Sequence, residues 1–290
     1  MSTRSRLASA AYTVTMGGPR IKEPQEEELR RAIGGRTVLV TGASAGIGRA
    51  LALQCGRAGA TVALIARRED ALAELAEEIR AEGGTATVHP CDLSDLEALD
   101  ATAEEVLAAH GHVDVLVNNA ARSIRRRVTD SFDRFHDVER TVQLNYLAPV
   151  RLMHRVLPGM LKAGDGHIIN CLSLGVLATP PKFAAYLGSK AALDAYSRSV
   201  AAELVEEGIR VTSAYLPLVR TEMIAPTASY DGAPALTAEQ AANMLASAMV
   251  DRPRRLAPPA GLLLDAARIV APTSLLTTGR ALQRRFASSH

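Results

Sequence analysis

Tyr186 and Lys190 are the residues whose types and spacing most directly indicate catalytic chemistry. In a helix, a spacing of four places both side chains on one face, one turn apart. A free tyrosine has a pKa of about 10, and a neighbouring ammonium group favours the phenolate and lowers that pKa. The pair could therefore act as a general acid or base near neutral pH. A tyrosine and a lysine at this spacing are common by chance. Ser173, thirteen residues upstream at the end of an expected strand, makes the pattern a more specific indication of a catalytic site.

A glycine-rich turn, TGASAGIG (41–48), ends the first apolar run of the chain. Gly42, Gly46 and Gly48 would allow a tight turn, a close backbone approach and tight packing of helix on strand. The N-terminal amides of the following helix would point at the turn, where a pyrophosphate can bind. Many such turns are purely structural, but the strand before this one and the helix after it favour a dinucleotide-binding site.

The second apolar run, 61–66, is followed directly by Arg67 and Arg68. At this point a dinucleotide-binding protein that prefers NAD normally places a carboxylate on the ribose 2′-hydroxyl, and here the first acidic residue is only Glu69. An arginine fork matches a 2′-phosphate, which a carboxylate would repel. The two arginines therefore favour NADPH over NADH, and the alternative is that they are solvated at a helix start.

The elements that must position these residues alternate regularly along the chain. Apolar runs separated by helical stretches predict a parallel sheet with helices on both faces, which is a doubly wound Rossmann fold of the α/β class. The expected strands are 37–41, 61–66, 85–89, 113–118, 167–171, 209–216 and a last one near 255–257. Long helices are expected over 133–161 and 184–207. One catalytic domain would span 35–258, preceded by a leader and short surface helix (1–34) and followed by a helical tail (259–290).

Composition excludes several functional classes. The chain of 290 residues is 48% hydrophobic, enough for a large core, and its 33 basic and 31 acidic residues leave a net charge of only +2. A nearly balanced charge and the absence of tryptophan argue against a nucleic-acid-binding protein, which needs a basic surface and aromatic side chains for stacking on bases. Three scattered cysteines indicate a reducing compartment, and no apolar run reaches the roughly 18 residues of a spanning helix, so we expect a cytoplasmic protein. His110 and His112 lack a third ligand at suitable spacing, so no metal site is expected.

Several motifs together resemble the short-chain dehydrogenase/reductase family over 35–258. They are TGASAGIG, CDL (91–93), NNAA (118–121), Asn145, Ser173, YLGSK (186–190) and PLVRT (217–221). The resemblance implies that Ser173 orients a substrate carbonyl and that Tyr186 donates the proton. It also implies that Lys190 lowers the tyrosine pKa and holds the nicotinamide ribose, while Asn145 supports a water relay.

The resemblance extends to the cofactor. Asp92 and Leu93 would flank the adenine, and Asn119 would contact its ribose. Two departures from the family pattern are Ala121 in place of a glycine and the absence of a Pro-Gly step after Pro217, which makes contacts from Val219 and Thr221 less secure. The complete expected cofactor set is Gly42, Ser44, Ala45, Gly46, Ile47, Gly48, Arg67, Arg68, Asp92, Leu93, Asn119, Tyr186, Lys190, Val219 and Thr221.

A narrower resemblance, over 122–152 and 215–227, is to the bacterial long-chain fatty acyl-CoA reductases of short-chain type. It implies NADPH-dependent reduction of a long-chain acyl thioester to a fatty aldehyde, by a homodimer or homotetramer. An alternative is a ketoreductase or alcohol dehydrogenase acting on a lipid-like or polyketide-like ketone or aldehyde. A non-catalytic NADPH-binding module is a third possibility, but it predicts loss of proton-transfer residues that are all present here.

Two segments remain open to more than one interpretation. Arg122, Arg125, Arg126 and Arg127 could hold the phosphates of a coenzyme A or phosphopantetheine carrier, or be solvated, or form an oligomer contact with acids. In the tail, Pro272 is expected to divide two helical segments, the second carrying Arg280, Arg284 and Arg285 beside leucines. This tail could lie at a membrane interface or cover an acyl channel, or it could pack on the protein's own core or on a second subunit.

Overall fold

The computed structural model describes residues 15–16, 18–224, 230 and 233–270. Its centre is a seven-stranded sheet with the order β3-β2-β1-β4-β5-β6-β7, in which every neighbouring pair is parallel. The strands are β1 (Thr37–Thr41), β2 (Thr61–Ala66), β3 (Thr85–Pro90), β4 (Val115–Asn118), β5 (Gly166–Ser173), β6 (Ile209–Leu216) and β7 (Arg255–Leu256). The strand order reverses between β1 and β4, and open α/β sheets bind ligands at the carboxyl ends beside such a reversal.

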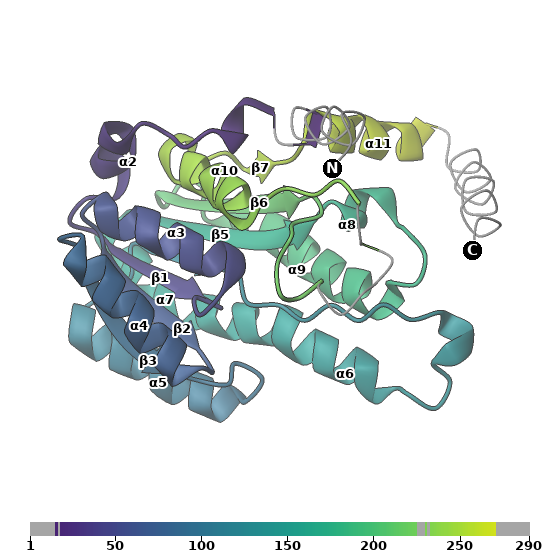
Figure 1. The fold of residues 1–290 in the computed structure, drawn as a ribbon, viewed down its shortest axis with the longest axis horizontal. Helices are drawn as coiled ribbons and strands as arrows, with labels where there is room; N and C mark the ends of the chain where they lie inside the picture. The colour runs from purple at the N-terminus through teal and green to yellow at the C-terminus, as the bar shows by residue number, and fades with distance from the viewer. Residues whose placement is uncertain (1–14, 17, 225–229, 231–232, 271–290) are drawn as a thin grey trace.

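Helices cover both faces of the sheet, which confirms the expected doubly wound architecture (Figure 1). Val38 and Val40 of β1 belong to one core and Leu39 to the other, because successive side chains of a strand point to opposite faces. The first core is closed by α2 (Glu26–Ile33), α3 (Gly46–Arg57), α4 (Glu69–Ala81) and α10 (Ala238–Asp251). The second is closed by α5 (Leu96–His110), α7 (Ala148–Ala163) and α9 (Ala184–Glu203).

The structure differs from the expected helix boundaries in two places. The helix expected over 133–161 begins only with α6 (His136–Val142), passes through the π-helical turn η3 (Gln143–Leu147) and continues as α7 to Ala163. Helix α9 ends at Glu203 and not at residue 207. The chain then turns at Gly208, whose φ of +80° and close approach to the carbonyl of Gly164 require a residue without a Cβ.

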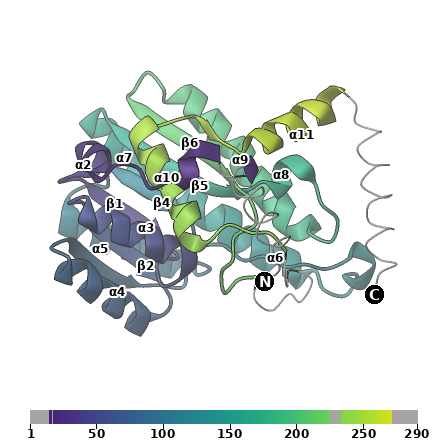
Figure 2. The ribbon, with the colours of Figure 1, turned by 45° about the horizontal axis from the view of Figure 1, so that its top comes forward.

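The two ends of the chain add short helices to this core. Leu29 and Ile33 bury the apolar edge of α2, as expected for an amphipathic surface helix. Near the other end, α11 (Pro259–Val270) packs on the one-turn helix α8 (Gly175–Ala178), and both lie at the same end of the molecule in Figure 1 and Figure 2. The short 3-10 turns are η1 (Gly18–Ile21) and η2 (Val128–Asp130).

Some expectations fall on residues outside the described ranges. They concern most of the leader and the second tail segment with Arg280, Arg284 and Arg285. Within the residues that the structure describes, no helix is both long and apolar enough to cross a membrane.

Candidate active site

The carboxyl end of β5 and the first turns of α9 bring together the residues that the sequence predicts to be catalytic. Ser173 is the last residue of β5, while Tyr186 and Lys190 lie one turn apart on α9. The hydroxyl of Ser173 lies close enough to that of Tyr186 to lower the tyrosine pKa as a hydrogen-bond donor. The Ser173 Oγ also accepts a hydrogen bond of 3.1 Å from the amide of Gly175, which fixes the serine at the start of α8.

Lys190 is buried, with only 2% of its surface exposed. Its Nζ donates a hydrogen bond of 2.8 Å to the carbonyl of Cys171, two residues before Ser173 on β5. Burial lowers the lysine pKa to about 8, because a desolvated ammonium is unstable relative to the neutral amine. Burial also raises the pKa of the Cys171 thiol to about 12, which disfavours the thiolate that a nucleophilic cysteine would need.

The pKa of Tyr186 does not follow the simple expectation from its spacing to Lys190. Burial raises this pKa to about 12, and the hydrogen bond from Ser173 only partly opposes the rise. The lysine ammonium is directed at the strand carbonyl, so it does not supply the predicted lowering of the tyrosine pKa. The structure therefore places the pair one turn apart as predicted, but the direction of the tyrosine pKa shift is the opposite of the predicted one.

Asn145 lies inside the π-helical turn η3 and is fully buried. Its Nδ2 donates to the carbonyl of Arg122 at 2.9 Å and to the Oγ of Ser189 at 3.0 Å. Its Oδ1 accepts a hydrogen bond of 2.8 Å from the amide of Arg122. The side chain thus ties the loop after β4 to α9 and is occupied by protein groups. A π-turn is rare and is frequently found at functional sites.

The glycine turn has the backbone that the motif requires. Gly42 adopts a φ of +66°, and a Cβ on Gly48 would lie 2.4 Å from the carbonyl oxygen of Gly42. The side chain of Asn119 braces the turn, because its Nδ2 donates to the carbonyls of Thr41 at 2.9 Å and Gly42 at 3.3 Å. Ala45, at the N-cap of α3, provides no side-chain cap. The first amides of this helix are therefore suited to bind a phosphate.

Arg68 lies at the rim of this turn, where its Nη2 donates to the carbonyl of Ser44 at 3.0 Å. It also lies 3.5 Å from the carboxylate of Glu222, an exposed pair that leaves the guanidinium accessible. Arg67 is exposed, and its side chain makes no hydrogen bond or ion pair among the described residues. The structure thus brings one of the two predicted arginines to the glycine turn.

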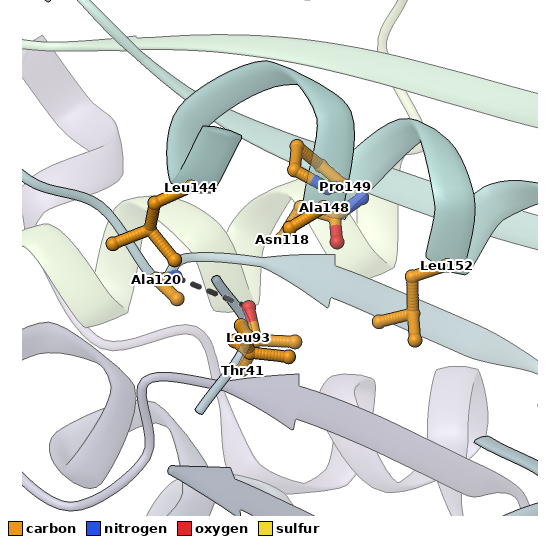
Figure 3. Close-up of a pocket in the computed structure, with 8 residues that line it drawn as sticks. All are labelled: Thr41, Leu93, Asn118, Ala120, Leu144, Ala148, Pro149 and Leu152. Atoms are coloured by element: carbon orange, nitrogen blue, oxygen red, sulfur yellow. Dashed lines mark hydrogen bonds between the residues drawn. The ribbon is translucent and has the colours of Figure 1, made fainter. Parts of the chain in front are cut away.

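The remaining predicted cofactor residues surround the same turn. The Cγ2 of Thr221 lies 3.1 Å from the position of a Cβ on Gly46, and the neighbouring Val219 is held by a parallel bridge to Leu236. Asp92 is exposed, and its Oδ1 accepts the amide of Ser94 at 2.9 Å. Leu93, a further member of the expected cofactor set, is buried and lines a small hollow beside β1 and β4 (Figure 3). That hollow is formed by Thr41, Leu93, Asn118, Ala120, Leu144, Ala148, Pro149 and Leu152.

Thr41 and Ser189 are structural parts of the site that the residue patterns did not single out. The Oγ1 of Thr41 accepts the amides of Asn119 at 3.0 Å and Ala120 at 3.1 Å, the second of which Figure 3 shows. Ser189 donates to the carbonyl of Tyr186 at 2.7 Å. Both residues belong to motifs that the sequence already indicated, TGASAGIG and YLGSK. A hydroxyl side chain next to a predicted site residue was therefore the signal that could have identified them.

No metal site is found among the described residues, since no three histidine, cysteine or acidic side chains are grouped suitably. His110 Nε2 lies 3.0 Å from the Oγ1 of Thr87, and His112 Nε2 lies 3.1 Å from the Oδ1 of Asp114. Each histidine therefore has its own protein partner, as in a structural role.

Comparisons with known proteins agree with this geometry. The profile of the short chain dehydrogenase family matches residues 36–231. A fatty acyl-CoA reductase of Acinetobacter baylyi is 49% identical over 247 residues, which cover 85% of this chain and 84% of the relative. A fatty acyl-CoA reductase of Mycobacterium tuberculosis is 50% identical over 239 residues, which cover 82% of this chain and 81% of the relative.

Solved structures show the same relationship. A short-chain dehydrogenase from Streptomyces avermitilis matches with a TM-score of 0.72 and 30% identity, covering 86% of this chain and 97% of that one. A metagenomic short-chain oxidoreductase in complex with NADP matches with a TM-score of 0.65 and 34% identity, covering 76% of this chain and 92% of that one. With its parallel sheet, glycine turn and matching profile, the chain belongs to the short-chain dehydrogenase/reductase family of oxidoreductases.

Proposed function

We propose that this oxidoreductase uses NADPH to reduce a long-chain acyl thioester, such as an acyl-CoA, to the fatty aldehyde. The observation that carries the proposal is the grouping of Ser173, Tyr186 and the buried Lys190 at the end of β5 and the first turns of α9. This group lies at the carboxyl edge of the sheet, which also holds the glycine turn. The choice of an acyl thioester rests on the similarity to two proteins named fatty acyl-CoA reductase.

The residues present fit a nicotinamide dinucleotide. The N-terminus of α3 carries no side-chain cap, and Gly48 keeps the backbone free of a Cβ that would meet Gly42. In our proposal the amides of 44–48 hold the pyrophosphate, and Arg68 with Arg67 holds the 2′-phosphate. The other members of the expected cofactor set, from Asp92 to Thr221, would contact the rest of the cofactor. When bound, NADPH would supply the hydride for reduction of the substrate carbonyl.

The protein side of the chemistry is proton donation and orientation. Ser173 and Tyr186 would both donate hydrogen bonds to the carbonyl oxygen, and Tyr186 would transfer its proton as negative charge develops there. For Lys190 to favour the resulting phenolate, its ammonium would have to move from the carbonyl of Cys171 toward the tyrosine, which lies one turn away on α9. Asn145 would support proton supply through the loop that its side chain holds in place.

A thioester differs from a ketone in having a leaving group. Addition of hydride to a thioester, with the proton from Tyr186, gives a hemithioacetal. Its collapse restores the carbonyl double bond, returns the hydroxyl proton to the tyrosine and expels a thiolate whose parent thiol has a pKa of about 8.5. The products are an aldehyde and a free thiol, whereas reduction of a ketone releases nothing.

Helix α11 is suited to form one wall of an acyl-chain site. A Cβ on Gly261 would lie 2.4 Å from Leu174, so this helix packs closely against the residue that follows Ser173. Leu262 and Leu263 on the same helix are exposed by 43% and 72%. We propose that this apolar surface receives the distal acyl chain and can touch a membrane surface peripherally, while the Gly261 edge packs on the core.

The cellular setting is part of the same proposal. All three cysteines are free and buried, which supports a reducing, cytoplasmic environment. Leu147 and Leu161 are exposed by 38% and 39%, and this supports a homodimer or homotetramer in which a second subunit covers them.

The decisive experiment measures thiol release. Purified protein is mixed with NADPH and palmitoyl-CoA, and NADPH oxidation and free thiol are followed together, with Tyr186→Phe as the inactive control. We expect stoichiometric aldehyde and thiol. Oxidation of NADPH with β-keto substrates and no thiol from any thioester would instead assign the protein to the ketoreductases.

A further inference from the structure

The loop after β4 is fixed on both sides of the candidate active site. At Arg122 its amide and carbonyl are bonded to the side chain of Asn145, at 2.8 and 2.9 Å. At Arg126 its amide donates to the carbonyl of Lys182, at 2.7 Å. Lys182 lies only four residues before Tyr186. The three residues between the two anchors, 123–125, therefore must run along the rim of the site.

The four arginines of this loop differ in their partners. The guanidinium of Arg126 donates from its Nε to the Oδ2 of Asp137 at 3.1 Å. Asp137 is itself buried and also accepts hydrogen bonds from Arg134 and Arg140. Burial alone would raise the pKa of this carboxyl, but the bonds to these arginines hold the pKa below its usual value. Arg126 is therefore part of a structural ion cluster, in which its Nε is held by the carboxylate of Asp137.

Arg125 has the opposite character. It is exposed, and no carboxylate pairs with it among the residues that the structure describes. Burial raises the pKa of the Tyr230 phenol, and the Arg125 guanidinium opposes that rise, so the two side chains lie close enough to interact. Arg125 lies within the segment 123–125, whose two anchors at Asn145 and Lys182 flank the candidate site, so its exposed guanidinium lies at the rim.

Lys182 adds a second cation to the same rim. It occupies a left-handed backbone conformation with a φ of +74°, immediately before α9, and no carboxylate pairs with it in the described part of the chain. A non-glycine residue in this conformation is uncommon, and its strain is tolerated here where its carbonyl anchors the loop at Arg126. The rim therefore carries two unneutralised positive side chains from two separate segments.

We propose that Arg125 and Lys182 bind the phosphate groups of the phosphopantetheine carrier that bears the acyl thioester. This inference rests on the proposed function, because only a thioester substrate brings such a carrier. The pantetheine arm separates the phosphates from the thioester, so their partners are needed at the rim and not beside Tyr186. A guanidinium presents a planar fork of donors that matches a phosphate, and an ammonium adds a second point charge.

The test compares two substrates that differ only in the carrier. Palmitoyl-CoA carries the phosphates, whereas the palmitoyl thioester of N-acetylcysteamine has the same reacting group and no phosphate. A charge-assisted contact at an exposed rim is weaker than a buried one, because solvent screens it. We therefore expect Arg125→Ala to raise KM for palmitoyl-CoA roughly tenfold and KM for the uncharged thioester less than about twofold. Lys182→Ala should act in the same direction.

Arg127→Ala is the matched control, because Arg127 is an exposed arginine of the same loop beyond the Arg126 anchor. It should leave both KM values within about twofold, and thermal unfolding of each variant checks that the fold is retained. An equal rise of KM for both substrates in Arg125→Ala, or an equal effect of Arg127→Ala, would overturn the assignment. The same assay with palmitoyl thioester on an acyl carrier protein distinguishes the two sources of phosphopantetheine, because Arg125→Ala should raise KM more for the source that Arg125 binds.

This outcome is separable from that of the proposed function. If the parent protein releases thiol from neither thioester, the acyl reductase proposal fails. If it releases thiol from both and Arg125→Ala does not discriminate between them, only the phosphate site is wrong.

Discussion

Replacing Lys190 with methionine should make the cofactor-free protein more stable while abolishing its activity. Lys190 is an ammonium group held in a nearly closed interior, 2% exposed, with the carbonyl of Cys171 as its hydrogen-bond acceptor. Methionine has a similar length and no charge, so it fills the same space without the desolvation cost. The substitution therefore separates the function of this residue from its effect on stability.

The size of the effect follows from the pKa of Lys190, which burial lowers from 10.5 to about 8. Each unit corresponds to roughly 1.4 kcal/mol, so the charged form destabilises the fold by about 3 kcal/mol. The variant also loses the hydrogen bond from Lys190 to the carbonyl of Cys171, which destabilises it by about 1 kcal/mol or somewhat more and offsets part of this gain. The net gain for Lys190→Met at pH 7 is then about 1–2 kcal/mol, and for a domain of this size Tm should rise by roughly 3–6 °C.

The dependence on pH has a defined sign. At pH 7 the lysine is protonated in both the folded and the unfolded protein, so the full penalty is present. Between pH 8 and 10.5 the unfolded chain keeps its proton while the folded one loses it, and the stability of the parent protein rises through this window. The difference in Tm between Lys190→Met and the parent should therefore shrink as the pH increases from about 7 to 9.

Thermal unfolding by circular dichroism at about pH 7, 8 and 9, without NADPH, measures both effects. Lys162→Met is the matched control, because Lys162 is an exposed lysine on α7, and it should change Tm by no more than about 1 °C at any of these pH values. A lower Tm for Lys190→Met at neutral pH would refute the reasoning. So would a Tm difference that stays constant across this pH range.

Four further substitutions and one truncation test the rest of the site. Tyr186→Phe keeps the ring and removes the proton donor, so turnover should fall at least about a hundredfold while NADPH binding, followed by fluorescence, is retained. Arg68→Asp should reverse the preference for NADPH in steady-state kinetics, and Arg67→Asp should do so less, because only Arg68 reaches the glycine turn; comparable efficiency with both cofactors in the parent would contradict this. Gly48→Ala places a Cβ 2.4 Å from a backbone oxygen, so it should weaken NADPH binding at least about tenfold by calorimetry. Truncation after Pro259 should raise KM for palmitoyl thioesters much more than for butyryl thioesters, whereas an equal loss for both would assign the tail to structure alone.

The sheet could be predicted from the sequence because its strands are buried on both faces. A run such as 61–66 is apolar throughout, and this continuity together with the helices between strands indicates a parallel sheet. The π-helical turn η3 could not be predicted in this way. It depends on Asn145 being held by the backbone of Arg122, 23 residues away, and no local pattern carries that contact.

The arrangement of the proposed catalytic residues could be predicted from the sequence, but the electrostatics of the candidate site could not. Helical spacing placed Tyr186 and Lys190 on one face, and the end of a strand placed Ser173 beside them. The tyrosine pKa depends on burial by the rest of the fold, which spacing alone does not reveal. Likewise, Arg125 and Arg126 are neighbours in sequence, and only the contact of Arg126 with Asp137 distinguishes a structural arginine from a free one.

The five residues from Tyr186 to Lys190 explain how the hydroxyl of Tyr186, the proposed proton donor, is held in place with few contacts of its own. Lys190 ties α9 to β5 through the carbonyl of Cys171, at 2.8 Å. Ser189 accepts a hydrogen bond from Asn145 and so ties the same turn to η3, at 3.0 Å. Two bonds in different directions, from adjacent residues, fix both the position and the rotation of the helix. The hydroxyl of Tyr186 is therefore held against Ser173 by the helix that carries it, and this preorganised placement is what transfer of a proton to a substrate oxygen requires.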